Sequence, residues 1–526
     1  MSLPYLIDDC VYDILQYLQN DGTTLFNCLL VNRFWCKTTI PLLYTNPFVI
    51  ISKKKNMIIS TIILCFNKEE ILQLKNQLGI NQINNNNNNI DYEEHKPLFE
   101  YLNYLEDYNH SKIKSFIIMF INYNLGLSIF TDKMYEDIIL IFHQSILRQS
   151  RNIKQLDISL HLFYKQGFKN FNVQNFISNL TKLKSLSLSL DDIINNEIKQ
   201  EFLGNITNNS LNLSKLIIKL TQTRGSVNSK NTIWENLYKI IQGKNKLKIF
   251  KIWNCYSLLN NIILSLEFQK HSLVHIEFIR SNFINVNLKR FNNLYNLEYL
   301  IFKSCEGILL NQCEILNFAS FKLKELSFIR NRWNDDVTSL MIKYLGESLQ
   351  RLLIENPTIQ LIENISMYCS NLIFLEIRIY LYIDLSVLEF LKNLRIRILN
   401  INISYNIDKF FINLANNIPI NINKITFTIR LRESINFLKL EEFLENCHNN
   451  FEIINLKHII EFKLLKIILN YIEKSNNSLK ILGVMKLNKK LNDEELKLLN
   501  RIKDKGVEIM EFNSIHDVHK MYNISI

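Results

Sequence analysis

Residues 297–331 read LEYLIFKSCEGILLNQCEILNFASFKLKELSFIRN, and one six-residue pattern occurs near both ends of this stretch. The pattern has apolar residues at its first, fourth and sixth places, as in LEYLIF (297–302) and LKELSF (323–328). Alternation of apolar and other residues at the end of each copy is typical of a short β-strand with one buried face. The two copies start 26 residues apart, which leaves room for a helix between successive strands.

The pattern recurs through most of the chain, with Ile or Phe also at the apolar places. Clear copies are LKSLSL (183–188), LSKLII (213–218), LKIFKI (247–252), LVHIEF (273–278), LQRLLI (349–354), LIFLEI (372–377) and LKILGV (479–484). Weaker copies are IKSFII (113–118), IKQLDI (153–158), IRILNI (396–401), INKITF (422–427), FEIINL (451–456) and VEIMEF (507–512). From 247 to 372 the starts lie 26, 24, 26, 26 and 23 residues apart, a spacing that chance does not maintain.

This period and pattern resemble those of leucine-rich repeats, in which each unit supplies one short strand and one helix. A single unit cannot bury its apolar face, whereas stacked units form a continuous core and a curved sheet. Cys255 and Cys305 fall three residues past the last apolar strand position, and Asn331 takes the same place in its unit. A small polar side chain there can hydrogen-bond the backbone where the chain leaves the sheet. The Cys-containing units resemble the repeat subclass that is often joined to F-boxes.

The first 48 residues carry a different set of motifs. They begin with Leu3-Pro4, continue with ILQYL (14–18) at helical spacing, and then contain CLLVNRFWC (28–36) and PLLYTNPF (41–48). Three short helices have too small a core to bury this much apolar surface, so part of it must face a partner.

These motifs resemble an F-box, the module that docks on the Skp-type adaptor of cullin-based ubiquitin ligases. One departure is Tyr5-Leu6-Ile7, which lengthens the offset between Leu-Pro and the first helix. The resemblance implies that the adaptor contact, or the core behind it, is formed by Leu3, Pro4, Ile14, Leu15, Leu18, Leu29, Leu30, Val31 and Trp35. The alternative is that Ile14, Leu18, Leu29 and Val31 only pack the three helices together.

We therefore expect an α/β chain in which an N-terminal all-α F-box (1–48) precedes a leucine-rich-repeat solenoid (111–526) with a curved parallel sheet and outer helices. Residues 49–110 form a helical joint between the two. Within this joint we predict one or two helices in 57–78, a polar Asn-rich loop at 80–94 and an amphipathic helix at 97–108.

Composition and charge exclude several classes of protein. The net charge of +11 raises the question of nucleic-acid binding, but Asn, Ile, Lys, Tyr and Phe are all abundant and all use A/T-rich codons. Codon bias accounts for the excess Lys, and we expect no nucleic-acid partner. The apolar runs at 57–66 and 116–130 are too short or too polar to span a bilayer, and the acidic N-terminus does not match a signal peptide. We expect a cytoplasmic or nuclear protein with no membrane contact.

We find no catalytic or metal-binding constellation in the sequence. The nine Cys are scattered with no CxxC pair, and no Gly-rich phosphate loop occurs. His271 and His275 are four residues apart, and His516 and His519 three apart, but neither pair has a convincing third ligand. We expect no enzyme activity in the chain itself and no cofactor.

The strands themselves predict a binding face. Counted from the first leucine of a copy, the third, fifth and seventh side chains leave the core. In the central repeats these places hold aromatic residues and cations beside Ile, a composition typical of protein-binding surfaces. We predict that a target protein binds at Lys251, Trp253, His275, Tyr299, Lys303, Ile329, Arg351, Phe374 and Arg378. The alternative is that neighbouring loops cover some of them.

Together the two resemblances imply the substrate-recognition subunit of a Skp–cullin–F-box ubiquitin ligase. Its partners would be a Skp-type adaptor, cullin through that adaptor, and an unidentified target protein. Its contribution would be proximity, because it would hold target lysines near the ubiquitin-conjugating enzyme. The alternatives are a protein-interaction scaffold not coupled to ubiquitin transfer and a sensor that binds a small ligand.

Overall fold

The fold was analysed in a computed structural model of the 526-residue chain. The structure describes residues 8–19, 21–50, 55–78, 97–125, 132–164, 168, 171–190, 196–209, 212–221, 232–243, 246–380, 383–403, 409–429, 437–487 and 489–517. Contacts divide the chain into two compact units, Met1–Ser272 and Leu273–Ile526.

The first unit opens with a helical module made of α1 (Asp8–Tyr17), α2 (Gly22–Cys28) and α3 (Arg33–Thr45). Polar side chains fix the starts of the second and third helices. The Asp21 carboxylate accepts hydrogen bonds from the backbone N–H groups of Thr23 and Thr24, and the Asn32 amide oxygen accepts one from Trp35 N–H at 2.9 Å. Such N-caps satisfy backbone donors that have no partner within the helix. Leu29–Val31 therefore lie in the turn between α2 and α3, and not in a helix.

Further helices brace this module against the first strand of the sheet. They include α4 (Pro47–Ile50), α5 (Lys55–Leu64), α6 (Lys68–Leu78), η3 (Tyr101–Tyr104), α7 (His110–Leu125) and α8 (Asp132–Gln149). Asn46, just past α3, donates to the Asp107 carboxylate at 2.7 Å, and Glu106 N–H donates to the Thr45 carbonyl at 2.9 Å. The module is thereby bonded directly to the start of the first strand.

The first unit contains five parallel strands in sequence order. They are β1 (Asp107–Asn109), β2 (Gln155–Ser159), β3 (Ser185–Leu190), β4 (Lys215–Leu220) and β5 (Ile249–Trp253). The connections carry α9 (His161–Tyr164), α10 (Val173–Ser178), α11 (Asn196–Asn208), α12 (Thr232–Gln242), α13 (Leu259–Leu266) and η5 (Glu267–Gln269).

The second unit contains ten parallel strands, again each beside the next in sequence. They are β6 (His275–Ile279), β7 (Tyr299–Lys303), β8 (Glu325–Ile329), β9 (Arg351–Glu355), β10 (Phe374–Ile379), β11 (Ile398–Ile403), β12 (Lys424–Ile429), β13 (Ile453–Ile459), β14 (Ile481–Met485) and β15 (Glu508–Glu511). The connections and the last helix are η6 (Leu288–Asn293), α14 (Leu310–Cys313), η7 (Glu314–Phe318), α15 (Asp335–Leu345), α16 (Ile359–Tyr368), η8 (Leu385–Asn393), α17 (Phe410–Asn417), α18 (Phe437–Asn446), α19 (Phe462–Lys474), α20 (Asp493–Asp504) and α21 (Phe512–Asp517).

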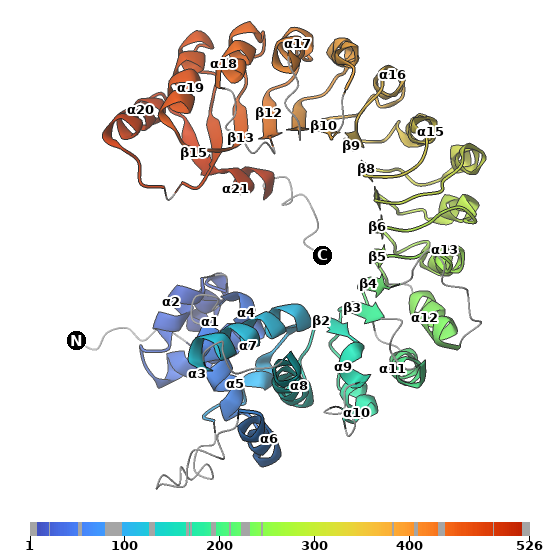
Figure 1. The fold of residues 1–526 in the computed structure, drawn as a ribbon, viewed down its shortest axis with the longest axis vertical. Helices are drawn as coiled ribbons and strands as arrows, with labels where there is room; N and C mark the ends of the chain where they lie inside the picture. The colour runs from blue at the N-terminus through green and yellow to red at the C-terminus, as the bar shows by residue number, and fades with distance from the viewer. Residues whose placement is uncertain are drawn as a thin grey trace. The chain divides into compact units, whose positions relative to one another are not determined.

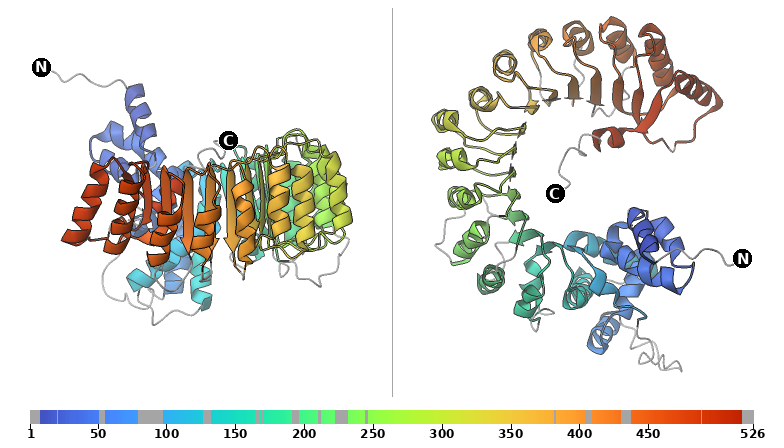
Figure 2. Two further views of the ribbon diagram at one scale, coloured as in Figure 1. Left: turned by 90° about the horizontal axis from the view of Figure 1, so that it is seen from above. Right: turned by 180° about the vertical axis from the view of Figure 1, so that it is seen from behind.

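In this unit the strands line the inner side of an arc and the connecting helices form its outer side (Figures 1 and 2). The sixth place of the repeat pattern builds part of the core between these layers. It is Phe278, Phe302 and Phe328 in three successive copies, and neighbouring rings stack with centroids 5.8 and 5.9 Å apart. Burial of one such ring contributes about 1.5–3 kcal/mol, so repetition of the pattern stabilises the stack. The α/β repeat solenoid predicted from the sequence is confirmed.

The polar side chains that follow β7 and β8 act as expected. Asn331 donates from its side-chain amide to the Phe302 carbonyl at 3.1 Å and accepts from Cys305 N–H at 2.9 Å. The Cys305 thiol, in the same place one repeat earlier, donates to the Phe278 carbonyl at 3.3 Å. These bonds satisfy buried backbone groups where the chain turns away from the sheet.

Two predictions about local structure are wrong. Residues 97–108 form the short helix η3 and the start of β1, and not an amphipathic α-helix. The weak copy at 113–118 lies inside α7, whereas every other copy of the pattern runs into a strand. The reason is visible in the burial of Ile113, Phe116 and Ile117, because spacings of three and four residues place these side chains on one face of a helix.

Candidate protein-interaction surfaces

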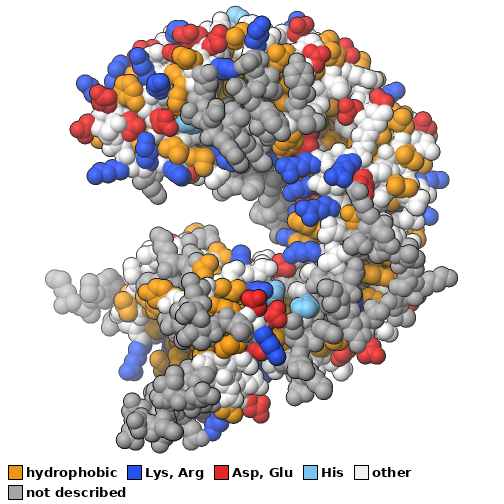
Figure 3. Space-filling model, viewed as in Figure 1, with side chains coloured by type: hydrophobic (Ala, Val, Ile, Leu, Met, Phe, Trp, Pro, Cys, Tyr) orange, Lys and Arg blue, Asp and Glu red, His pale blue; other side chains and the backbone are white. Residues whose placement is uncertain are grey.

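The helical module exposes large apolar side chains. Tyr17 is 92% exposed and Leu30 79%, and Val31 and Phe34 follow Leu30 around the turn into α3. We call the exposed set the module patch; it consists of Tyr12, Ile14, Tyr17, Leu30, Val31 and Phe34. Hydrophobic side chains gather on this part of the first unit in Figure 3. Exposed apolar side chains in such numbers on a small module are typical of a protein-interaction site.

The predicted adaptor-binding residues divide into surface and core. Ile14, Leu30 and Val31 are exposed, whereas Leu15 has no exposed surface at all. The half-buried members are Leu18, Leu29 and Trp35. Leu3 and Pro4 lie outside the described residues. The core of the module is instead formed by Val11, Leu15, Leu25, Cys28, Ile40 and Leu43. Leu15 therefore stabilises the module from inside, and the exposed residues are the ones available to a partner.

The second candidate surface is the inner face of the sheet in the second unit. Strand register brings His275, Tyr299, Glu325, Arg351 and Phe374 into one row across β6 to β10. The His275 and Tyr299 rings stack with centroids 5.8 Å apart. Lys303 and Ile329 are cross-strand neighbours in a second row. The repeat register thus collects these predicted target-binding side chains on one face.

Lys251 and Trp253 lie on β5, the last strand of the first unit. Both side chains are half-buried. On this unit Lys251 is the cross-strand neighbour of Ile217, and Trp253 of Lys219.

Ion pairs run through the inner face and were not predicted from the pattern. Arg351 Nε lies 3.2 Å from a Glu325 carboxylate oxygen, and Arg378 Nε donates to Glu376 at 2.7 Å. The Arg351 guanidinium also lies over the Phe374 ring, with its central carbon 4.3 Å from the ring centroid. Phe374 is consequently only 6% exposed, although we expected it to be open to a partner. An arginine on the same face covers it.

Farther along the sheet, several outward positions are buried. Asn400, Thr426 and Asn455 have less than 5% of their surface exposed, and so does Lys424. Burial lowers the pKa of Lys424 to about 8. Lys424 is the signal in the sequence that could have pointed to this row. It occupies the first outward position of β12, and Arg351 occupies the same position three strands earlier.

The last helix covers the inner face of β13 and β14. Phe512 and Ile515 of α21 are buried, and the Asn455 side-chain amide donates to the Phe512 carbonyl at 3.4 Å. Gly483 on β14 lies between them, and a Cβ at this glycine would collide with the Ile515 side chain and the Asn455 amide oxygen. The repeat pattern gave no indication of this contact, because it depends on a helix that follows the last strand.

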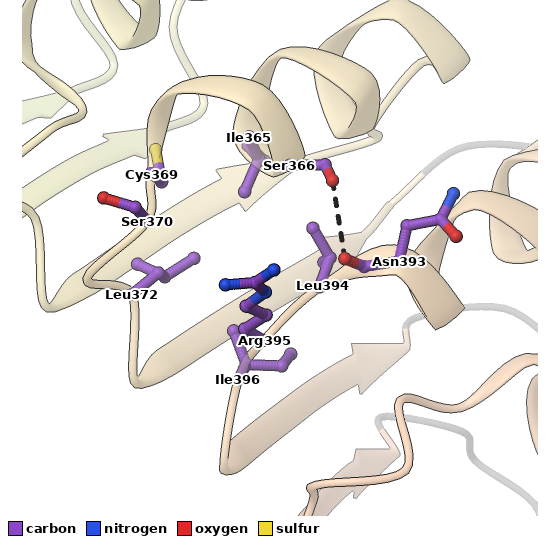
Figure 4. Close-up of a pocket in the computed structure, with 9 residues that line it drawn as sticks. All are labelled: Ile365, Ser366, Cys369, Ser370, Leu372, Asn393, Leu394, Arg395 and Ile396. Carbon is purple, nitrogen blue, oxygen red and sulfur yellow. Dashed lines mark hydrogen bonds between the residues drawn. The ribbon is translucent and has the colours of Figure 1, made fainter.

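A shallow pocket of about 290 Å³ lies between the end of α16 and the start of β11 (Figure 4). It is lined by Ile365, Ser366, Cys369, Ser370, Leu372, Asn393, Leu394, Arg395 and Ile396. The Ser366 hydroxyl donates to the Asn393 carbonyl at 3.4 Å. Burial raises the pKa of the Cys369 thiol to about 12, so the thiol is protonated at neutral pH and is a poor nucleophile.

A buried cluster of titratable groups lies in the first unit. The Tyr108 hydroxyl and His143 Nδ1 are 2.7 Å apart, and the His143 ring stacks on His110 with centroids 4.5 Å apart. Burial lowers the pKa of His143 well below its usual value and that of His110 to about 4. Both rings are neutral at pH 7, and the cluster packs β1 against α7 and α8. In the part of the chain that the structure describes, no group of three or more His, Cys, Asp or Glu side chains could hold a metal ion.

Similarity to known proteins is confined to solved structures. No family model matches the sequence, and no curated protein matches it. Among solved structures, the chain is similar to TLR13 in its complex with ssRNA13 (14% identity, 70% of this chain and 48% of that one, TM-score 0.33). The chain therefore spans about half the length of TLR13.

Two further similarities cover more of the other protein. One is to the complex of Rad7 and Elc1 in yeast (13% identity, 77% of this chain and 94% of that one, TM-score 0.30). The other is to the leucine-rich-repeat-containing protein LegL7 from Legionella pneumophila (11% identity, 68% and 89%, TM-score 0.29). No helix among the described residues is both long and apolar enough to span a membrane.

Proposed function

We propose that this chain is the substrate-recognition subunit of a Skp–cullin–F-box ubiquitin ligase. In this proposal the helical module binds a Skp-type adaptor, the adaptor binds cullin, and the repeats hold a target protein. The observation that carries the proposal is the module patch, because it includes Ile14, Leu30 and Val31 of the F-box-like motif. Exposed apolar side chains gathered on one module are typical of a surface that a partner protein covers.

The free energy available from burial of the module patch supports a specific contact with a partner. Full burial of one large apolar side chain contributes about 1.5–3 kcal/mol. Tyr17 and Leu30 are the most exposed residues of the module patch, so binding of a partner can still bury most of their surface. A few such anchors dominate the affinity of a typical protein interface. We therefore expect Leu30 and Tyr17 to contribute more to adaptor binding than Leu15, which is already buried within the module.

The repeats would contribute target binding without chemistry. Tyr299, His275 and Arg351 lie in one row on the inner face, and aromatic and arginine side chains are enriched among interface hot spots. A target held there has its lysines at a high effective concentration near the ubiquitin-conjugating enzyme.

The experiment is a pull-down of a purified Skp-type adaptor and cullin by the full chain. We expect the chain to retain both proteins, and Tyr17→Ala with Leu30→Ala to lose both. The control is Leu72→Ala, which truncates a 56% exposed leucine of α6 outside the module. Retention of adaptor without cullin would favour the scaffold alternative. Retention of both proteins by the double variant would contradict the proposed role of the patch.

A further inference from the structure

Four cations lie along the carboxyl ends of β6, β7 and β8. Arg280 follows β6, Lys303 ends β7, and Arg330 and Arg332 follow β8; all four are exposed. Backbone bonds connect their positions, because Arg280 N–H donates to the Lys303 carbonyl at 2.8 Å and Arg332 N–H to the Cys305 carbonyl at 2.7 Å. Adjacent strands are about 4.8 Å apart, so these residues form one short edge across three strands. We call them the basic edge.

The backbone at two of these cations is in a conformation that arginine rarely adopts. Arg280 and Arg330 have φ angles of 50° and 53°. The same position in neighbouring repeats holds Ser304 and Asn356, also at positive φ. Asn adopts this left-handed region more easily than Arg, because its short polar side chain can bond locally. Unfavoured residues at repeated backbone positions often mark a functional surface.

The acidic side chains near the basic edge have other partners. The Glu355 carboxylate accepts a hydrogen bond from the backbone N–H of Arg330; it forms no ion pair with the guanidinium, although the charge of Arg330 still stabilises the carboxylate. Glu376 is paired with Arg378 at 2.7 Å. The Arg330 guanidinium instead lies 5.0 Å from the centroid of the Tyr380 ring, a contact that restricts its motion without neutralising its charge. Within the described ranges, no acidic side chain forms an ion pair with any of the four cations of the basic edge.

We infer that the basic edge binds an extended segment of the target protein rich in Asp and Glu. The inference rests on the proposed function, since it names the chemistry of the target. Cations on three adjacent strands span roughly 10 Å, so they match several carboxylates spread along an extended peptide better than a single phosphate. Exposed Ile284 and half-buried Ile301 and Ile329 supply apolar surface nearby.

A nucleic acid fits this edge less well. The edge offers four cations over three strands, a span of only two strand spacings of about 4.8 Å each. Binding of a duplex draws on a longer row of phosphate contacts than three strands offer.

The test uses the purified full chain and three fluorescent probes measured by anisotropy. The probes are a 12-residue peptide rich in Glu and Asp, a neutral peptide with one phosphoserine, and a single-stranded oligonucleotide. The variant carries Arg280→Gln, Lys303→Gln and Arg330→Gln, which remove charge and keep side-chain length. The control variant carries Lys322→Gln, Lys392→Gln and Lys466→Gln, three exposed lysines of the same unit away from the edge.

We expect the acidic peptide to bind best, and the edge variant to lose about tenfold in affinity with a weaker dependence on salt. The control variant should change by less than about twofold. No binding of the acidic peptide, equal loss in both variants, or preference for the phosphopeptide or oligonucleotide would overturn the inference. Adaptor pull-down by the same variants separates the two proposals, because intact adaptor binding with no acidic-peptide binding rejects this inference alone.

Discussion

The side chain of Ile515 occupies the space that a side chain at Gly483 would need. Ile515 belongs to α21 and is buried, so the contact fastens this helix to the inner face of β14. A glycine in a strand lacks side-chain packing and weakens the strand unless another segment must approach closely. Here the close approach explains the residue.

Gly483→Ala should therefore destabilise the end of the second unit. The added methyl group collides with Ile515 and with the Asn455 amide oxygen, and we expect a loss of about 1–3 kcal/mol in the free energy of unfolding. Urea denaturation with hydrogen exchange of β13 to β15 measures this loss. The control is Gly204→Ala on α11, where the nearest atom to a new Cβ is 3.6 Å away. Equal stability of Gly483→Ala and the wild type would show that α21 does not pack as described.

Substitution of Leu30 and Trp35 by Ala should abolish adaptor pull-down. Leu30 is 79% exposed, so its truncation removes contact area and little internal packing. Trp35 is half-buried, and for this reason the single variants must be compared with the double variant by circular dichroism. Leu15→Ala is the matched contrast, since it should lower stability by about 2–5 kcal/mol through a cavity in the core. A folded double variant that still binds the adaptor would refute the F-box assignment.

The first unit should lose stability as the pH falls below about 6.5. Burial lowers the pKa of His110 to about 4, whereas the unfolded side chain titrates near its ordinary value. Above both values the ring is neutral in both states and the folded state has no penalty. As the pH falls from about 6.5 to about 4 the unfolded state binds the proton more readily, so stability declines by up to a few kcal/mol.

The variant His110→Gln tests this assignment by urea denaturation at several pH values. Its stability at pH 7 can differ from that of the wild type, but its decline between pH 6.5 and 4 should be shallower. His143 shares the same cluster, and burial lowers its pKa as well, so part of the decline should remain. An identical pH profile in both proteins would show that His110 does not carry the effect.

Target capture should depend on which residue of the Arg351–Glu325 ion pair carries the positive charge. The single variant Arg351→Glu places two carboxylates together and exposes Phe374, so it should lower stability by about 1–3 kcal/mol as well as binding. Exchange of the two residues, Arg351→Glu with Glu325→Arg, retains an ion pair and reverses the surface that a target meets. Affinity purification followed by identification of captured proteins measures the outcome. Capture of the same proteins at wild-type levels by the exchange variant would place the target elsewhere.

The sequence predicted the strands well because strand register and repeat period are local properties. LEYLIF and LKELSF predict both the strand and the side chains that leave the core, and β7 and β8 follow them. The same reasoning failed at IKSFII (113–118), where a helical period was also present and α7 formed. A six-residue window cannot distinguish these periods, because apolar residues at its first and fourth places fit a helix as well as a strand.

The site was less predictable because exposure depends on neighbours in space. Alternation along β10 places Phe374 on the inner face, but only the position of Arg351 on the next strand shows that it is covered. Likewise Leu15 and Leu30 belong to the same resemblance, although one is core and the other is surface. Cross-strand and turn geometry decide these cases, and neither can be read from a single repeat.

Burial of residues on β11 to β14 limits the area that a partner can contact on the inner face of the second unit. Several outward side chains between Asn400 on β11 and Asn455 on β13 are already buried, and α21 packs on β14. The row from His275 on β6 to Phe374 on β10 spans four strand spacings, or about 19 Å. A standard interface of about 800 Å² per partner is wider than this in at least one direction. A ligand centred on these strands would extend beyond them, and one direction open to it is the carboxyl edge of the sheet, where Arg280, Lys303 and Arg330 lie.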